Sequence, residues 1–474
     1  MKHFTYRTLP ELRLDAERLG ARHVLFEENP EAVRAILARP VSVGGLRVGN
    51  SIAIHPMEGC DGTLDGRPDE LVWRRYQRFG RGGAKLIWFE ATAVSSEGRA
   101  NMRQLWIHEK NAGDFARLLE MTLRVHREEF GASDDLLAPL QLTHSGRYSV
   151  PRPIIVYHNP LIDRKSATPP DYPVITDDEL ERLEDQYVDA ARLALEAGFR
   201  AIDIKVTHGY LLSELLGAKT RDGRYGGSLE NRTRFIRNVF GKMRAEFGGR
   251  LMPCMRLGCF DGIPYLTDPA TGLGAPMEHP IPYPYGFGVD ARDPLRENLA
   301  EVKQAIASFR RSGLELLNVS LGCPYYNPHV GRPFEKPDEG NYEPPEHPLA
   351  GVDRHFRIAG ELQRAFPELP MVGTGYSWLQ RFSVNAAARN ISDGNIRFFG
   401  LGRAALAYPD LPRDVLASGE IDERRVCKTL TFCTFLMRQK NHPLGQFPTG
   451  CPPFDKEGYG LIMKQARESK RSCS

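Results

Sequence analysis

The sequence has few of the features that mark several large protein classes. No apolar run approaches the ~18 residues that a transmembrane helix needs. The first 20 residues contain no apolar stretch of the signal-peptide kind, so we expect a cytoplasmic protein with no membrane partner. The 63 Lys and Arg residues nearly balance the 60 Asp and Glu residues, and the formal net charge is +3. This balance gives no electrostatic reason to expect a nucleic-acid partner.

Cysteine is also scarce. The chain has eight cysteines among 474 residues, and Cys60, Cys254, Cys259 and Cys323 stand alone in the sequence. This pattern excludes a disulfide scaffold and predicts reduced thiols. Internal repeats and low-complexity tracts are absent from the sequence. A hydrophobic content of 41% and a charged content of 26% are typical of a globular protein with a large core.

From residue 51 onward, short apolar runs alternate regularly with amphipathic helical stretches. We count eight such runs, at 51–55, 84–90, 136–142, 200–206, 251–257, 314–320, 369–373 and 396–400. Strands that alternate with helices predict a parallel sheet with helical crossovers. Eight units within about 370 residues favour an α/β fold of the closed (β/α)8 TIM-barrel type over a doubly wound open sheet.

The flanking and connecting segments complete the predicted organisation. We expect an N-terminal extension over 1–40, the barrel over 41–420 and a C-terminal helical extension over 421–474. The connections 145–176 and 258–293 are too long for ordinary turns and predict loop insertions over the active face. A helix is predicted over 176–198, because its sequence begins with a capping box and ends at a glycine.

Polar residues stand at the ends of the predicted strands, where a barrel carries its chemistry. Side chains alternate between the two faces of a strand, so Lys205 would point into the barrel, and His208 and Tyr210 follow on the loop. The plainest alternative is that Lys205 pairs with a buried carboxylate, such as Asp203 or Glu90. Further strand-end polar residues, which a cofactor or substrate would satisfy, are Glu90, Gln141, His144, Arg147, Arg256, Asn318 and Ser320.

The last two predicted strands run into glycine-rich turns, VGTGYS (372–377) and FGLGRAAL (399–406). In barrels, phosphate groups often bind at the loops after strands seven and eight. Glycines let backbone amides approach an anion closely, and Arg403 adds a charged fork. The two turns together predict a phosphate site.

Several segments carry a resemblance to a known family. The chain resembles the Old Yellow Enzyme family of FMN-dependent ene-reductases, especially its branch of NADH:flavin oxidoreductases and dienoyl-CoA reductases. The resemblance covers about residues 50–412, and its most specific part is YGGSLENRTRF (225–235). The other matching segments are NSIAIHPMEG, GGAKLIWFEATAVSSEGR, LQLTHSGR, HGYLLSELLGAKTRDGR, VGTGY and GLGRAALAYPDLP.

The resemblance implies a (β/α)8 barrel, FMN as cofactor, NADH or NADPH as reductant and a small-molecule substrate. It leaves the assembly open, with a homo-oligomer among the expectations. Carried over by position, it implies that one end of the barrel holds the flavin. The implied cofactor-binding residues are Pro56, Met57, Glu58, Ala91, Gln141 and Arg256 along the ring, and Gly375, Gly402 and Arg403 at the phosphate.

The implied catalytic residues are Lys205, His208 and Tyr210. Tyr210 lies where the family often has a tyrosine that protonates the substrate. The family commonly places His-x-x-His or His-x-x-Asn where this chain has Lys205 and His208. Lysine can donate to an oxyanion, although as a point charge on a mobile stem. We therefore expect a substrate with an electron-withdrawing carbonyl or carboxylate group, in which a carboxylate would pair with Lys205.

The implied activity is hydride transfer from reduced FMN to an activated C=C bond. An FMN-dependent amine dehydrogenase or demethylase of the same branch is the first alternative, but an amine would favour an acidic or aromatic pocket over Lys205. A flavin electron-transfer protein is the second, although a carrier needs neither the polar set at 205–210 nor the long loop. A flavin-free barrel hydrolase is the third.

The three cysteines of the segment 427–451 bear on a further cofactor. Longer members of the branch carry a [4Fe–4S] cluster on closely spaced cysteines. This chain has Cys427, Cys433 and Cys451, but Leu430 occupies the place of a middle cysteine. Four thiolates usually hold such a cluster. We therefore expect neither a [4Fe–4S] cluster nor another metal site. FMN would then be reduced directly by NAD(P)H or by a protein partner.

Overall fold

The computed structural model describes residues 3–150, 152–337 and 341–472. The chain begins with two short helices, α1 (Leu9–Arg18) and α2 (Pro30–Leu37), each opening on a proline behind a capping side chain. An antiparallel hairpin of β1 (Val41–Val43) and β2 (Leu46–Val48) follows. Within the described residues, no helix has the length and hydropathy required to cross a bilayer.

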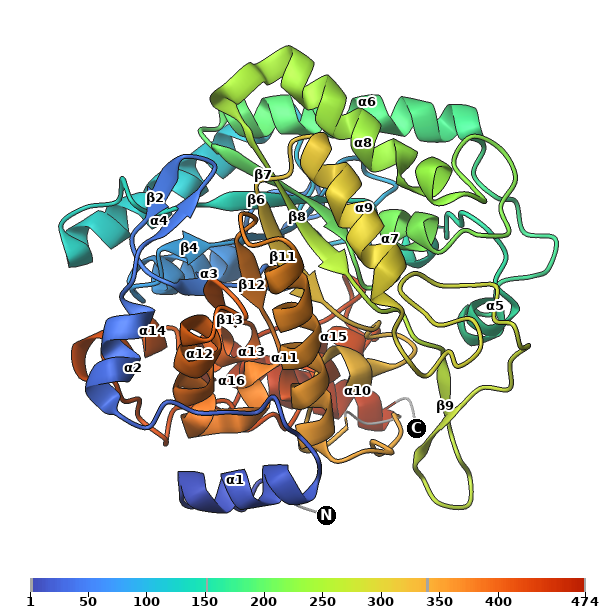
Figure 1. The fold of residues 1–474 in the computed structure, drawn as a ribbon. Helices are drawn as coiled ribbons and strands as arrows, with labels where there is room; N and C mark the ends of the chain where they lie inside the picture. The colour runs from blue at the N-terminus through green and yellow to red at the C-terminus, as the bar shows by residue number, and fades with distance from the viewer. Residues whose placement is uncertain (1–2, 151, 338–340, 473–474) are drawn as a thin grey trace.

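The centre of the molecule is a closed parallel barrel (Figure 1), so the predicted TIM barrel is confirmed and the open sheet is excluded. The strand order β4-β3-β13-β12-β11-β8-β7-β6-β5 ends on two consecutive strands. A bridge pairs Leu86 of β4 with Leu137, which lies just before β6, and this pairing closes the ring. The strands are β3 (Ile52–Ile54), β4 (Leu86–Ile87), β5 (Phe89–Ala93), β6 (Pro139–Thr143), β7 (Ala201–Val206), β8 (Met252–Gly258), β11 (Leu316–Ser320), β12 (Met371–Gly373) and β13 (Phe398–Leu401).

The structure departs from the prediction at the second strand. The run 84–90 forms two short strands, β4 and β5, instead of one. At Trp88, between them, the backbone N–H donates to the Ile54 carbonyl on one side. The β5 strand continues by pairing with β6 on the other side. The interruption lies beside a shift in the register between β5 and β6, which falls between Phe89 and Thr92.

Helices cover the outside of the barrel and alternate with the strands. The predicted capping box is present in α6, where Thr176 Oγ1 accepts from the Glu179 N–H and the Thr176 N–H donates to the Glu179 carboxylate. Ser228 likewise caps α8. The covering helices are α3 (Glu70–Gly80), α4 (Ala112–Phe130), α6 (Asp177–Glu196), α8 (Leu229–Phe247), α9 (Leu299–Arg311), α11 (Pro348–Ala365), α12 (Ser383–Ser392) and α14 (Leu411–Ser418).

The long connections are folded. Residues 145–176 contain the 3-10 turn η1 (Gly146–Tyr148) and α5 (Pro160–Ser166), and residues 258–293 contain the hairpin of β9 (Tyr265–Thr267) and β10 (Gly274–Pro276). This hairpin projects from the body at the lower right of Figure 1. The loop after β11 carries the short α10 (Pro328–Gly331), α7 (Leu211–Leu216) follows β7, and α13 (Arg403–Ala407) follows β13.

The C-terminal segment adds α15 (Phe432–Arg438) and α16 (Lys456–Ser472). These helices share a small apolar cluster with Leu71 of α3. Arg74 of the same helix forms an ion pair with Asp455 over 2.7 Å, and Arg78 forms a second one. The predicted C-terminal helical extension is therefore present and packs against α3.

The barrel interior is layered. An apolar layer fills the barrel at the N-terminal ends of its strands, and the hairpin of β1 and β2 packs against it. The layer contains Ala53, Trp88, Ala201, Cys254, Leu316, Val372 and Phe398, and the hairpin contributes Val41, Val43 and Val48. Side chains two positions further along a strand point to the same face. Asp203, Arg256 and Asn318 therefore form a second, polar layer above the apolar one, and Lys205 comes next on β7.

Candidate functional site

Asp203 organises the polar layer at the C-terminal ends of the strands. Its carboxylate accepts hydrogen bonds from Gln141 Nε2 over 2.5 Å, from Trp88 Nε1 over 2.9 Å and from the Arg256 backbone N–H over 2.6 Å. Burial raises its pKa to about 6, although these donors oppose the rise. Asp203 thus fixes one atom of Gln141 and the β8 backbone that carries the Arg256 side chain.

Lys205 lies directly above Asp203 but does not pair with it. Its ammonium nitrogen stands 3.8 Å from the centre of the Tyr210 ring, and the side chain is buried. Among the described residues it makes no hydrogen bond or ion pair, because Asp203 and Glu90 are engaged elsewhere. The alternative of a buried Lys205–carboxylate pair is therefore wrong.

The charge of Lys205 depends on its neighbours. Burial lowers its pKa to about 8, nearby Glu58 opposes the shift, and Arg256 adds to it. Arg256 is the cross-strand neighbour of Lys205 in the barrel sheet. Burial also lowers the pKa of Arg256, to about 10, so both side chains are cationic at neutral pH. The mouth of the barrel thus offers two adjacent positive charges.

Tyr210 and His208 occupy the loop that follows β7. The Tyr210 hydroxyl is 3.3 Å from the Tyr325 hydroxyl, and burial raises the pKa of Tyr210 well above its ordinary value. His208 has a positive φ of 68° and is half-buried. Burial, Arg256 and Lys205 lower the pKa of His208 well below its usual range. Both side chains are therefore neutral hydrogen-bond donors at neutral pH.

Pro56, Met57, Glu58 and Ala91 line the same end of the barrel, on the segments that follow β3 and within β5. The Glu58 carboxylate accepts from Asn101 Nδ2 over 3.0 Å, and burial raises its pKa. Ala91 is fully buried beside Gln104, whose side-chain amide donates to the Ala91 carbonyl.

The predicted phosphate turns also meet at this end. Gly375 has φ 92°, and a Cβ there would stand 2.9 Å from His355. A Cβ on Gly402 would stand 3.5 Å from Met57 Sδ, so the turn after β13 lies beside the segment after β3. Arg403 Nη2 donates to the Pro333 carbonyl over 2.7 Å. Because β12, β13 and β3 are neighbouring parallel strands, the two glycine turns, Arg403 and the β3 segment lie at the same end of the barrel.

Two residues at the mouth were missed from the sequence. His55 follows β3, and its Nδ1 lies 3.0 Å from Asn318 Nδ2 in the barrel interior. Burial and Arg256 lower the pKa of His55 well below its usual range. The position of His55, directly after β3 and two residues beyond the inward-facing Ala53, could have revealed it. The role of Tyr325 depended on a loop contact that no periodicity predicts.

Arg147, expected at the site, is instead a structural clamp. Its guanidinium forms ion pairs with Asp163 and Glu214, both over 2.5 Å, and is fully buried. This ties the 145–176 insertion to α7. A similar buried network below Glu58 joins Arg75 bidentately to Asp61, with Glu90 3.5 Å away. These charges are partnered and are not available to a ligand.

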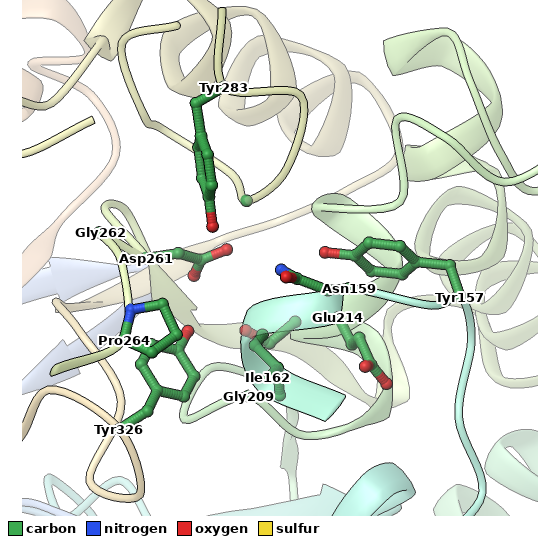
Figure 2. A pocket seen from close by; sticks show the side chains of 12 residues that line it. Tyr157, Asn159, Ile162, Gly209, Glu214, Asp261, Gly262, Pro264, Tyr283 and Tyr326 are labelled. Carbon is green, nitrogen blue, oxygen red and sulfur yellow. The ribbon is translucent and has the colours of Figure 1, made fainter. Parts of the chain in front are cut away.

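Behind the loop of His208, the folded insertions enclose a small cavity of about 20 Å³ (Figure 2). Tyr157, Asn159, Asp261, Tyr283 and Tyr326 turn polar atoms toward it. The volume is enough for about one water molecule. Burial raises the pKa of Asp261 to about 7. The insertions 145–176 and 258–293 therefore meet here through polar contacts.

Cys427, Cys433 and Cys451 are free thiols. Burial raises the pKa of Cys427 and of Cys451, and Cys433 adds to both shifts. Within the part of the chain that the structure describes, no group of three or more His, Cys, Asp or Glu side chains could hold a metal ion. The absence of a [4Fe–4S] cluster stays a prediction.

Comparisons with known proteins agree on one family. The model of the NADH:flavin oxidoreductase / NADH oxidase family matches residues 37–266. The NADPH dehydrogenase of Geobacillus sp. (strain WCH70) is 33% identical over 224 residues, which is 46% of this chain and 62% of that protein. The chain thus spans less than two thirds of that enzyme's length. The 12-oxophytodienoate reductase 1 of Oryza sativa subsp. japonica is 30% identical over 298 residues, 58% of this chain and 73% of that protein.

A solved structure shares the fold. The Old Yellow Enzyme homologue from Zymomonas mobilis superimposes with a TM-score of 0.55 at 21% identity, covering 80% of this chain and 92% of that one. At that identity the likeness supports the barrel architecture alone.

Proposed function

Because the chain belongs to the Old Yellow Enzyme family of NADH:flavin oxidoreductases, we propose that it is an FMN-dependent enzyme. It would use NADH or NADPH to reduce an activated C=C bond in a small carbonyl or carboxylate compound. Buried polar atoms at the barrel mouth carry this proposal. Arg256 Nε, Asn318 Oδ1 and Arg403 Nη1 have no hydrogen-bond partner among the described residues. Buried polar groups are normally satisfied, so their pattern fits a polar, anionic ligand.

The residues around the mouth suit a flavin with its phosphate. Pro56, Met57, Glu58, Ala91 and Gln141 would contact the ring, and Arg256 would place positive charge beside it. Gly375, Gly402 and Arg403 would hold the phosphate. When bound, FMN would supply the redox chemistry, taking hydride from the nicotinamide and passing it to the substrate. The protein would supply orientation and charge.

The substrate end of the proposal rests on Lys205, His208 and Tyr210. Lys205 is cationic and has no carboxylate partner among the described residues, so a substrate carboxylate or carbonyl oxygen would fill that role. His208 would add a neutral donor to the same oxygen. Tyr210, protonated at neutral pH, would give its hydroxyl proton to the substrate carbon. Donors fixed where charge develops contribute strongly to catalysis.

The alternative of an amine substrate is disfavoured. An ammonium group entering the mouth would meet Lys205 and Arg256, which are both cationic at neutral pH. Like charges repel in a site of low polarity. A flavin electron-transfer protein would have no use for the Lys205–Tyr210 pair, which lies within the mouth.

The proposed function can be tested directly on the purified protein. We expect a flavin absorbance in the visible spectrum that bleaches when NADH or NADPH is added without oxygen, and that returns when an enone or enoate is added. Iron and sulfide would be assayed alongside. A colourless protein that takes up no added FMN would refute the proposal, and stoichiometric iron would refute the prediction for the three cysteines.

Replacing Arg403 by methionine tests the phosphate site. A charged hydrogen bond contributes about 1.5–3 kcal/mol, so we expect the Kd for FMN to rise about tenfold to a hundredfold. The Kd would be measured by fluorescence titration of the apoprotein. Arg424→Met is the matched control, because that side chain is mostly exposed and pairs only locally with Asp422. Equal FMN affinity in both variants would contradict the assignment.

A further inference from the structure

A stack of three tyrosines stands over the mouth of the barrel. Tyr148, from η1, and Tyr325, from the loop after β11, lie with ring centres 3.8 Å apart at 20°. Tyr210 is nearly parallel to Tyr325, at 23°, with ring centres 6.3 Å apart. The stack joins the β7 loop, the β11 loop and the first insertion.

Exposure to solvent changes sharply along this stack. Tyr210 is only 4% exposed, whereas Tyr325 is 39% exposed. Among the described residues, the Tyr210 hydroxyl has Tyr325 as its single hydrogen-bond partner. Lys205 lies over the face of the Tyr210 ring instead of at its hydroxyl. Among the described residues, the Tyr210 hydroxyl is thus linked by hydrogen bonding only to Tyr325, a residue that reaches the surface.

The loop holds Tyr325 firmly. Asn327 Oδ1 accepts from the Cys323 N–H over 2.7 Å, and Asn327 Nδ2 donates to the Asp261 and Ile263 carbonyls. The neighbouring Tyr326 turns into the cavity of Figure 2, while Tyr325 faces the mouth. A turn tied in this way, with Tyr148 stacked on one side, keeps the Tyr325 hydroxyl beside Tyr210.

We propose that Tyr325 is a positioning residue that returns protons from solvent to Tyr210, and this rests on the proposed function of Tyr210 as the proton donor. After Tyr210 gives its proton to the substrate carbon, the Tyr325 hydroxyl passes a proton to the Tyr210 oxygen. Water then protonates Tyr325. One proton moves from solvent to product in each turnover, and the accompanying hydride comes from the nicotinamide through FMN.

The geometry fits a relay at rest. The separation of 3.3 Å is longer than an ideal O–H···O bond, and catalytic hydrogen bonds commonly shorten in the substrate complex. The groups that face this pair are Lys205, Glu58, Cys60 and Tyr148. Burial raises the pKa of both hydroxyls, and Glu58 and Cys60 add to the rise, which keeps the relay protonated at neutral pH.

The first test needs neither substrate nor flavin turnover. Tyrosine labelled with ¹³C at Cζ reports whether the hydroxyl proton exchanges quickly with solvent in mixed H₂O and D₂O. We expect one averaged Tyr210 resonance in the native protein and two separate resonances in Tyr325→Phe, which corresponds to exchange at least about tenfold slower. Tyr148→Phe is the control and should behave as the native protein does. Unchanged exchange in Tyr325→Phe would overturn the relay.

The second test uses turnover with cyclohex-2-enone as the probe. We expect Tyr325→Phe to slow reoxidation of the reduced enzyme about tenfold to a hundredfold, with a larger solvent isotope effect and unchanged reduction by NAD(P)H. In a Tyr210→Phe background, the same substitution should cost nothing further. Additive losses would show a structural role and refute the relay. If Tyr210→Phe alone leaves reoxidation unchanged, the proposed function of Tyr210 fails, whatever the exchange experiment shows.

Discussion

Replacing Lys205 by methionine is expected to lower kcat/KM for an α,β-unsaturated carboxylate by about a hundredfold to a thousandfold, which is the usual loss for one preset donor. Methionine keeps an unbranched side chain, one atom shorter, and removes its charge. FMN content should stay unchanged, because the proposed function assigns Lys205 to the substrate and not to the cofactor. Steady-state kinetics and the visible spectrum of the variant would check both parts.

A matched pair of substrates sharpens this experiment. The methyl ester of the same acid has no carboxylate for Lys205, so the variant should lose less activity toward the ester than toward the acid. An equal loss for both would show that Lys205 does not recognise a carboxylate. Loss of FMN in parallel with activity would instead assign Lys205 to the cofactor.

The same residue predicts a pH dependence. Lys205 carries its charge below its pKa of about 8 and loses it above. Activity toward the carboxylate should therefore fall as the pH rises through about 8 in the native enzyme. In Lys205→Met that limb should be absent from the kcat/KM profile, which a series of buffers at constant ionic strength would reveal.

The second large effect concerns stability. Arg75→Met is expected to destabilise the fold by about 3–5 kcal/mol, the usual cost of breaking a buried ion pair. Arg75 donates to both Asp61 oxygens, and the side chains of Arg75, Asp61 and Glu90 are all essentially buried. Without Arg75, the buried Asp61 carboxylate would lose its charged partner. Denaturant unfolding would measure the loss.

Two controls separate this mechanism from simple loss of packing. Arg78→Met removes a partly exposed arginine from the same helix and should cost less than Arg75→Met. Adding Asp61→Asn to Arg75→Met should recover part of the stability, because one buried charge disappears. The deficit should also shrink at low pH, where the carboxyl groups become neutral in both states. A deficit independent of pH would refute the electrostatic cause.

The fold was predictable because its pattern is local. Short apolar runs and capped helices, such as the one that begins after Thr176, determine their own ends. The break at Trp88 was not predictable, since it accompanies a register shift between β5 and β6 that depends on how the two strands pair in the closed barrel. The interior position of Lys205 followed from strand alternation.

The other contacts of the site could be identified only from the three-dimensional structure. Asp203 looked like a partner for Lys205 in sequence, but its hydrogen bonds go to Gln141, Trp88 and the β8 backbone. Arg147 stands near the strand end in sequence, yet its guanidinium forms ion pairs that hold the 145–176 insertion against α7. Contacts between loops distant in sequence, such as Tyr210 with Tyr325, leave no periodic trace in the chain.

The hairpin of β1 and β2 packs its valines against the apolar layer at the N-terminal ends of the barrel strands. Its turn at Gly44 lies against Met252 at the start of β8. That end of the barrel is thus filled by packed side chains. A ligand would enter from the opposite end, where the strands carry their polar residues. Under the proposed function, a nicotinamide and a substrate that both react with FMN through this one opening would have to enter in turn. The oxidised nicotinamide would have to leave before the substrate enters, which is a ping-pong order with parallel lines in double-reciprocal plots.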